Sequence, residues 1–245
     1  MSQAIKIKSL SKSFGAIDAV CNISFDVGYG EVLGFLGPNG AGKSTTMKMI
    51  TGFLEPTSGT VEVNGHDVLE DPLSVKRSIG YLPEGAPAYG EMTVKSFLNF
   101  IADIRELSGS LRKNRLDEVI ETINIGTVID QSIETLSKGY KRRVGLAQAI
   151  LHDPDILIMD EPTDGLDPNQ KHEVRNLIKK MAKKKAIIIS THILEEVDAV
   201  CSRAIIISSG KLLFDGTPEQ LITKSDQKNI DHAYRNITTS NTLQS

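Results

Sequence analysis

Hydrophobic and polar positions alternate in two segments near the start of the chain. Residues 4–9 contain the run IKIK, and residues 22–27 read NISFDV. Successive side chains of a β-strand point to opposite faces, so a two-residue period is typical of strands that bury one face. Both segments are therefore predicted to be half-buried strands.

The pattern then changes to short apolar runs and one helical stretch. Residues 31–36 (EVLGFL) form a compact apolar run that ends in a glycine-rich turn. Residues 43–51 are predicted to be helical, with Gly52 at the position where a helix stop is expected. Residues 59–63 (GTVEV) are predicted to form a further strand, which the sequence Asn64-Gly65 turns.

The middle of the chain, about residues 93–127, has a helical pattern. Its apolar residues recur at spacings of three and four, which is the period of an amphipathic helix. We expect a helical lobe there, covering about residues 86–150, inserted into a β-rich frame. The apolar positions are Val94, Phe97, Leu98, Ile101 and Ile104, and then Leu116, Val119, Ile120 and Ile123.

Three continuous apolar runs follow the lobe, at residues 155–159, 186–190 and 204–208, and helical stretches separate them. Strands that are apolar at every position are typical of a mostly parallel sheet covered on both faces. From about Lys224 the chain is polar, so residues 223–245 are expected to form a short helix and a polar tail.

Composition and charge argue against a nucleic-acid-binding, a membrane-spanning or a secreted protein. The hydrophobic and charged fractions, 40% and 24%, are ordinary for a globular protein, and the net charge of −3 argues against nucleic acid as the main partner. No segment approaches the ~20 apolar residues that span a bilayer. The first residues also lack the apolar region of a secretory signal. We expect a soluble, cytoplasmic polypeptide whose two cysteines, Cys21 and Cys201, are reduced thiols.

The segment GPNGAGKST fits the phosphate-binding pattern G-x-x-x-x-G-K-[ST] and lies between a predicted strand and a predicted helix. Its glycines let backbone N–H groups turn toward an anion, and the following helix adds its positive N-terminal end. Lys43 is expected to reach the β- and γ-phosphates, and the Ser44 hydroxyl to bind Mg²⁺. The sequence thus predicts MgATP binding. The expected nucleotide-binding residues are Gly37, Pro38, Asn39, Gly40, Ala41, Gly42, Lys43, Ser44 and Thr45.

Two acidic residues, Asp160 and Glu161, follow directly after an apolar run. Acids at the end of a buried strand are costly unless a cation or a hydrogen-bond network receives them, and α/β sheets bind ligands at that edge. Asp160 suits the coordination of Mg²⁺, and Glu161 suits the alignment and deprotonation of the attacking water. The chain is therefore predicted to be an ATPase, with Glu161 and Lys43 among its catalytic residues.

Four further motifs make the chain resemble the ATP-binding subunits of ABC-type transporters over about residues 4–221. The segment LSKGY, residues 136–140, is similar to the family's LSGGQ signature and differs from it at two of five positions. DGLD, residues 164–167, resembles the D-loop, and His192 after a strand resembles the switch histidine. Phe14 lies where the family stacks an aromatic ring on adenine.

This resemblance implies an α/β fold with a P-loop NTPase (RecA-like) core, an N-terminal antiparallel β subdomain and an inserted helical subdomain. The ATPase domain would cover residues 1–222. It also implies a head-to-tail dimer with a second copy of the chain or with a paralogous ATPase subunit.

In such a dimer, Ser137 and Gly139 would contact the γ-phosphate held by the partner, and Asp167 would link the two sites. His192 would contact the γ-phosphate and hold the attacking water. Lys138 either adds positive charge near that phosphate or points to solvent.

The resemblance further implies a separate integral membrane permease subunit, which would hold the chain on the inner face of the cell membrane and select the cargo. LSKGY together with GYLPE is similar to single-domain ATPases that pair with export-type membrane subunits. The alternative is a soluble ABC-type ATPase that acts in macromolecular assembly.

Glu84 stands where the family carries the Q-loop glutamine. A carboxylate keeps an oxygen ligand for Mg²⁺ but adds negative charge near Asp160, Glu161 and the phosphates. We hypothesise that Glu84 keeps the metal-sensing role and raises the dependence of activity on Mg²⁺.

Overall fold

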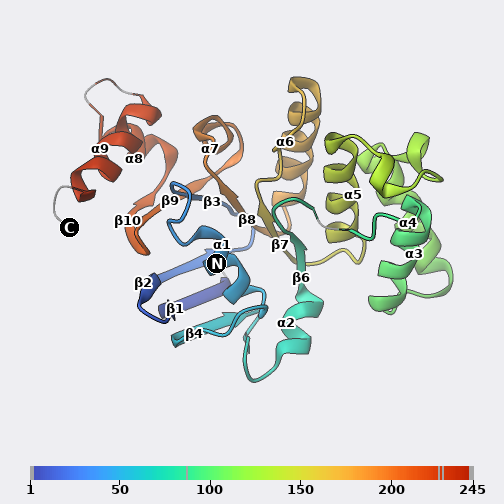
Figure 1. Cartoon of the computed structure of the whole chain (residues 1–245), viewed down its shortest axis with the longest axis horizontal. Coiled ribbons are helices and arrows are strands. Elements are labelled where there is room, and N and C mark those ends of the chain that lie inside the picture. The colour runs from blue at the N-terminus through green and yellow to red at the C-terminus, as the bar shows by residue number, and fades with distance from the viewer. Residues whose placement is uncertain (1–2, 87, 226, 228, 243–245) are drawn as a thin grey trace.

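Two β-sheets organise the residues that the computed structural model describes, which are 3–86, 88–225, 227 and 229–242. In the larger sheet the strands from β9 to β6 are parallel, and β10 is an antiparallel edge strand (Figure 1). Its spatial order is β10 (Lys211–Gly216), β9 (Arg203–Ser208), β3 (Val32–Leu36), β8 (Ala186–Thr191), β7 (Ile156–Asp160) and β6 (Ile79–Leu82).

The smaller sheet is antiparallel and comes from the first part of the chain. Its order is β2 (Ile17–Gly28), β1 (Gln3–Phe14), β4 (Ser58–Val63) and β5 (His66–Asp67). Together with helix α1 (Lys43–Ile50) it covers one face of the larger sheet, and the core between them contains Ile5, Phe35 and Met47.

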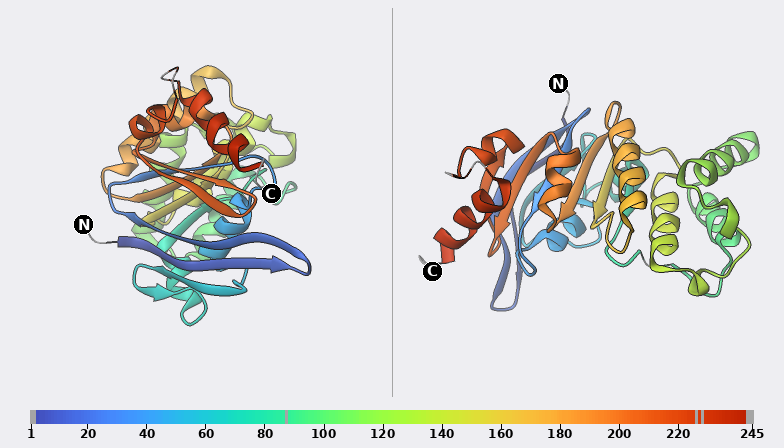
Figure 2. Two further views of the ribbon diagram at one scale, coloured as in Figure 1. Left: turned by 90° about the vertical axis from the view of Figure 1, so that its left-hand side faces the viewer. Right: turned by 90° about the horizontal axis from the view of Figure 1, so that it is seen from above.

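The other face of the larger sheet carries helices, and more helices extend the molecule at both ends. Figure 2 shows α3, α4 and α5 beyond β6 at one end and α8 and α9 beside β10 at the other. The helices are α2 (Pro72–Ser78), α3 (Val94–Ile104), α4 (Gly109–Ile123), α5 (Lys138–Ile150), α6 (Pro168–Ala182), α7 (Leu194–Val200), α8 (Pro218–Ile222) and α9 (Ile230–Thr242), with 3₁₀ turns at Gly126–Val128 and Ile133–Thr135.

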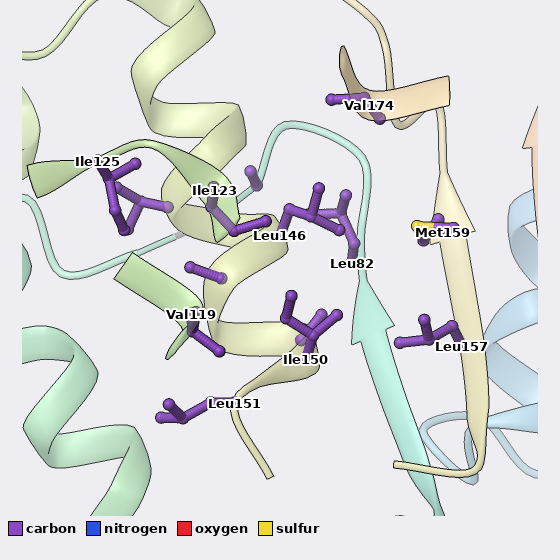
Figure 3. Close-up of a cluster of buried hydrophobic side chains, with 14 of the residues drawn as sticks. Leu82, Val119, Ile123, Ile125, Leu146, Ile150, Leu151, Leu157, Met159 and Val174 are labelled. Atoms are coloured by element: carbon purple, nitrogen blue, oxygen red, sulfur yellow. The ribbon is translucent and has the colours of Figure 1, made fainter. Parts of the chain in front are cut away.

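The continuous apolar runs fill both faces of the parallel sheet, as predicted. In β7, Ile156 and Ile158 point into the core that contains α1 and the smaller sheet, while Leu157 and Met159 point to the opposite face. Figure 3 shows these last two residues directed toward Ile150 and its neighbours on α5. A strand buried on both faces needs apolar residues at every position, which explains why the run does not alternate.

The predicted architecture is confirmed: an α/β core, an antiparallel sheet from the N-terminal part and a helical region after β6. None of the helices in the described part of the chain is long and apolar enough to cross a membrane. Ile104, one of the apolar positions of the helical pattern, lies in α3 as predicted but is 59% exposed. It ends α3, past the turns that pack on the rest of the lobe.

Several elements differ from the predicted ones. The β1–β2 hairpin continues to Phe14 and Ile17, beyond the alternating segments, because backbone pairing with register shifts extends it through residues without a clear pattern. The four-residue strand β6 and the edge strand β10 were not predicted. Helix α9, Ile230–Thr242, is longer than the expected short helix. Ala233 on it is fully buried, in a hydrophobic cluster that includes Phe214 of β10 and Leu221 of α8.

Candidate nucleotide-binding site

The phosphate-binding loop lies between β3 and α1, at the carboxyl edge of the larger sheet. The Lys43 side chain is 7% exposed, and its ammonium donates to the carbonyl oxygens of Gly37 at 2.7 Å and Pro38 at 3.1 Å. Burial lowers the pKa of Lys43 from its ordinary value, and the nearby carboxylates of Glu161, Asp160 and Glu84 act in the opposite direction. A cation is therefore held inside the loop, where phosphate oxygens can reach it.

Glycine is required at two positions of this loop. Gly42 has a φ of 104°, and a Cβ atom there would lie 2.4 Å from the Ala19 carbonyl oxygen. Gly37 has the same constraint, since a Cβ atom would lie 2.4 Å from the Ile207 carbonyl oxygen. The loop is thus wedged between β2 and β9, and a side chain at either glycine would push it out of place.

A cavity of about 270 Å³ opens at the loop and brings half of the predicted site residues together. The residues that line it are Ala19, Asn39, Gly40, Gly42, Lys43, Ser44, Thr45, Glu84, Asp160 and Glu161. Ala19 on β2 was not predicted, because an alanine carries no chemical signal of a site. A larger hollow, about 550 Å³, lies between α4 and α6, and none of the predicted site residues lines it.

The Glu161 carboxylate is held by the residues that follow β8. Its Oε1 lies 2.6 Å from Nδ1 of His192 and accepts from the His192 backbone N–H at 3.1 Å, while its Oε2 accepts from the Thr191 hydroxyl at 3.1 Å. The side chain of Glu161 is 12% exposed and that of His192 is 57% exposed. The two residues predicted to act on the attacking water are therefore in direct contact. Thr191 joins them as a residue that the sequence did not single out.

The residues predicted to bind Mg²⁺ fit that ion. Ser44, Glu84 and Asp160 line the same cavity, and each offers an oxygen atom, the ligand that Mg²⁺ prefers. Asp160 is 2% exposed at the end of β7. Among the described residues, no group of three His, Cys, Asp or Glu side chains could hold a metal by itself. The donor set thus suits an ion that also takes ligands from a bound phosphate.

The signature residues begin α5 and do not line the cavity. Ser137 caps this helix by accepting from the Tyr140 N–H at 3.3 Å, and Gly139 packs against Gln170. The Lys138 ammonium forms an ion pair with Asp164 at 2.8 Å, so it contacts the D-loop of its own chain. This contact with Lys138 lowers the pKa of Asp164.

Two other predicted residues lie apart from the cavity. Phe14 ends β1, is 49% exposed, and has the Lys12 ammonium 5.2 Å from its ring centre. Asp167 caps α6 by accepting from the Gln170 N–H at 2.9 Å. The cavity therefore contains the phosphate and metal residues, while the residues expected for adenine and for the partner's phosphate lie outside it.

Comparisons with known proteins identify the family of the chain. The ABC transporter family model matches residues 20–164. An ABC transporter ATP-binding protein of Bacillus subtilis (strain 168), YxlF, described as uncharacterized, is 38% identical over 92% of this chain and 75% of its own. The bacitracin transport ATP-binding protein BcrA of Bacillus licheniformis is 37% identical over 94% of this chain and 75% of its own.

A solved structure of an ATP-binding subunit of an ABC transporter superposes with a TM-score of 0.88. It is 30% identical and covers 96% of this chain and 99% of its own. The chain therefore belongs to the ABC transporter family, as an ATP-binding subunit and an ATPase.

Proposed function

We propose that the chain hydrolyses ATP in composite sites shared with a second copy of itself or a paralogous subunit, and that this cycle drives a separate membrane permease. One observation carries the proposal. The cavity holds Lys43, Asp160 and Glu161, whereas Ser137 and Gly139, at the positive N-terminal end of α5, do not line it. If the signature binds a γ-phosphate, that phosphate belongs to the nucleotide of another subunit.

The residues of the cavity have distinct roles in this proposal. The backbone of residues 37–45 and the Lys43 ammonium bind the phosphates, and the exposed ring of Phe14 stacks on adenine. Ser44, Glu84 and Asp160 hold Mg²⁺, which supplies positive charge opposite the phosphates when bound. Because Glu84 adds a carboxylate to this set, turnover is more dependent on Mg²⁺ than with a glutamine, and a Mg²⁺ titration of Glu84→Gln tests this.

Glu161 aligns the attacking water and takes up its proton. His192 already contacts the Glu161 carboxylate through Nδ1, which leaves its Nε2 free to face the γ-phosphate. In the dimer, Ser137, Lys138 and Gly139 act on the partner's nucleotide and Asp167 links the two sites. Lys138 must leave Asp164 to do so, because the two side chains are paired in the single chain.

We further propose the domain organisation that the sequence predicts. Residues 1–222 form the ATPase domain, about residues 86–150 form its helical subdomain, and residues 223–245 form a C-terminal helix and tail. The permease holds the chain on the inner face of the membrane and selects the cargo. The name of the bacitracin relative, which includes transport, supports this role.

Replacing Glu161 with glutamine tests the proposal. The variant keeps the shape of the side chain and loses its basicity, so kcat should fall by about 10²–10⁴-fold while ATP stays bound. Slow hydrolysis should also trap an ATP-dependent dimer, visible by size-exclusion chromatography with light scattering. Glu195→Gln, on an exposed acid of α7, is the matched control and should keep normal turnover.

Unaltered turnover in Glu161→Gln would overturn the assignment of the base. The same variant, purified gently with detergent and ATP, identifies the partner. A permease that co-purifies supports the transport role. Membranes that yield none, with a soluble assembly partner instead, favour the macromolecular-assembly alternative.

A further inference from the structure

Arg142 is a buried cation that the proposed reaction does not use. It is 5% exposed and lies near the start of α5. Burying a charged group is costly unless hydrogen bonds satisfy it, and burial lowers the pKa of this guanidinium, with Asp160 the first of the nearby carboxylates that oppose the shift. A guanidinium buried there needs hydrogen-bond partners that offset the free-energy cost of removing it from water.

Those partners are four backbone carbonyls of two loops. Nη1 of Arg142 donates to the Pro83 oxygen at 2.9 Å, Nε donates to the Pro162 oxygen at 3.4 Å, and Nη2 donates to the oxygens of Asp160 and Glu161. Guanidinium has five N–H donors in one rigid plane, so it can satisfy several acceptors at fixed relative positions. One side chain therefore joins the loop after β6 to the loop after β7.

Both loops carry acids of the ATP site. Pro83 directly precedes Glu84, and the β7 loop carries Asp160 and Glu161. Glu161 has a φ of 52°, in the left-handed region that residues other than glycine adopt at a cost of about 1–3 kcal/mol. The hydrogen bonds from Arg142 to the carbonyls on either side of this residue stabilise that conformation.

Helix α5 itself is fixed closely on β6. A Cβ atom at Gly145 would lie 2.7 Å from the Ala86 Cβ, and one at Gly80 would lie 2.1 Å from the Ala149 carbonyl oxygen. The Gln148 side chain also donates to the Tyr81 oxygen at 2.9 Å. The face of α5 that carries Arg142 thus contacts the strand leading to Glu84 at backbone distance.

We infer that Arg142 is a positioning residue for ATP hydrolysis, which sets Glu84 and Glu161 at fixed places relative to the helix that begins with the signature. A shift of α5 then moves both acids with it, so contact of the signature with a nucleotide and the placement of the catalytic carboxylate are coupled. The inference rests on the role proposed for Glu161.

The neighbouring arginine provides a matched control. Arg143 is 8% exposed, pairs with Glu173 at 2.8 Å, and donates to the carbonyl oxygens of Ile123 and Asn124 at 3.4 Å. None of these acceptors belongs to the two acid-bearing loops. Both arginines are buried in the same helix, so substituting either one removes a buried charge. Only the substitution of Arg142 also removes hydrogen bonds to the acid-bearing loops.

The experiment compares Arg142→Lys and Arg142→Gln with Arg143→Lys and Arg143→Gln in the full chain, measuring Tm, MgATP binding, KM and kcat. Arg142→Gln should lower kcat by about 10–100-fold with KM and ATP affinity within about two-fold, because the phosphate loop is untouched. The kcat of Arg142→Lys should lie between those of the unaltered protein and Arg142→Gln, since one ammonium cannot reproduce the hydrogen bonds of the planar guanidinium. Both Arg143 variants should keep kcat within about two-fold at a similar loss of Tm.

Three outcomes would overturn the inference: unaltered kcat in both Arg142 variants, a fall in kcat that follows Tm equally in both arginine pairs, or a fall in ATP affinity that accounts for the lost turnover. Should Arg142→Gln not fold, the pair Arg142→Lys and Arg143→Lys gives the same comparison. Glu161→Gln in the same assay separates the two proposals. If it turns over normally, the role of Glu161 fails; if it is inactive while Arg142→Lys and Arg142→Gln are normal, only the role of Arg142 fails.

Discussion

At the scale of single residues, the site depends on how each ionisable group is surrounded. Glu161 is adjacent in sequence to Asp160, yet its side chain contacts His192 and Thr191 across the sheet edge while Asp160 lies buried at the end of β7. The two neighbouring acids therefore have different surroundings and can take different roles. Lys43 likewise donates to two carbonyl oxygens of its own loop, which phosphate oxygens would replace in the proposed ATP complex.

A histidine away from the site predicts how stability depends on pH. Burial lowers the pKa of His152 from 6.5 to about 4, and the positive charge of Arg105 acts in the same direction. The Nε2–H group can donate to the Ile79 oxygen at 3.2 Å, while Nδ1 is buried without a partner among the described residues. Protonation would place a hydrogen on Nδ1, where no acceptor meets it.

The direction in which stability changes with pH follows from this lowered pKa. The unfolded chain takes up the proton near pH 6.5 and the folded chain only near pH 4, so the contribution of His152 is complete above about pH 6.5 and is lost as the pH falls to about 4. His152→Gln should remove up to about 3 kcal/mol of this pH dependence of the free energy of unfolding. Urea unfolding from pH 7 to pH 4 measures it, with the exposed His172→Gln as the control. Parallel curves for the unaltered protein and His152→Gln would contradict the prediction.

At the scale of elements, the contact of α5 with β6 decides where the signature helix lies. Local preference and packing oppose each other at Gly145. Alanine is a better helix former than glycine by about 1 kcal/mol. Its Cβ, however, would lie 2.7 Å from the Ala86 Cβ and 2.9 Å from Leu82 Cδ1, and overpacking of this kind costs about 1–3 kcal/mol.

Gly145→Ala should therefore destabilise the protein by up to about 2 kcal/mol in urea unfolding, in spite of the gain in helix propensity. Adding Ala86→Gly removes the methyl group that the new Cβ would meet, so the double variant should recover part of the loss. A double-mutant cycle isolates this coupling from the separate effects of each change. A stabilised Gly145→Ala variant would show that α5 can move away from β6 at little cost.

At the scale of the whole molecule, the signature lies outside the cavity at the phosphate loop, and we propose that the two are half-sites that a dimer combines. A mixture of two inactive variants tests whether they combine. Lys43→Ala removes the proposed phosphate ligand, and Gly139→Asp places a carboxylate where the partner's γ-phosphate is expected. In a mixed head-to-tail dimer one site contains both defects and the other contains neither.

The mixture should therefore recover activity that neither variant has alone. Random pairing makes half of the dimers mixed, and each of these has one intact site, so recovery is at most about a quarter of the unaltered turnover per chain. Steady-state phosphate release on mixing measures this value, and each variant measured alone, at the same total concentration, is the blank. Absence of any recovery would contradict a dimer of two copies of this chain with composite sites.

Features that depend on residues close together in the sequence were predicted better than features that depend on distant residues. The glycines and the lysine of the phosphate loop lie within one short segment, so their spacing in the sequence is enough to predict the shape of the loop. The edge strand β10 and the part of the β1–β2 hairpin next to its turn could not be predicted. Their half-exposed residues acquire strand structure only by pairing with a neighbour.

The sequence by itself determined the parallel sheet, through runs that are apolar at every position, and ATP binding, through the types and spacing of residues 37–45 and the two acids after β7. Only the tertiary structure decided that Arg142 joins loops 59 and 19 residues away, that Lys138 pairs with Asp164, and that Glu161 rests on His192. The physical reason is the same in each case. Such contacts depend on how helices pack on the sheet, and a linear pattern records which face of an element is apolar but not which distant backbone it meets.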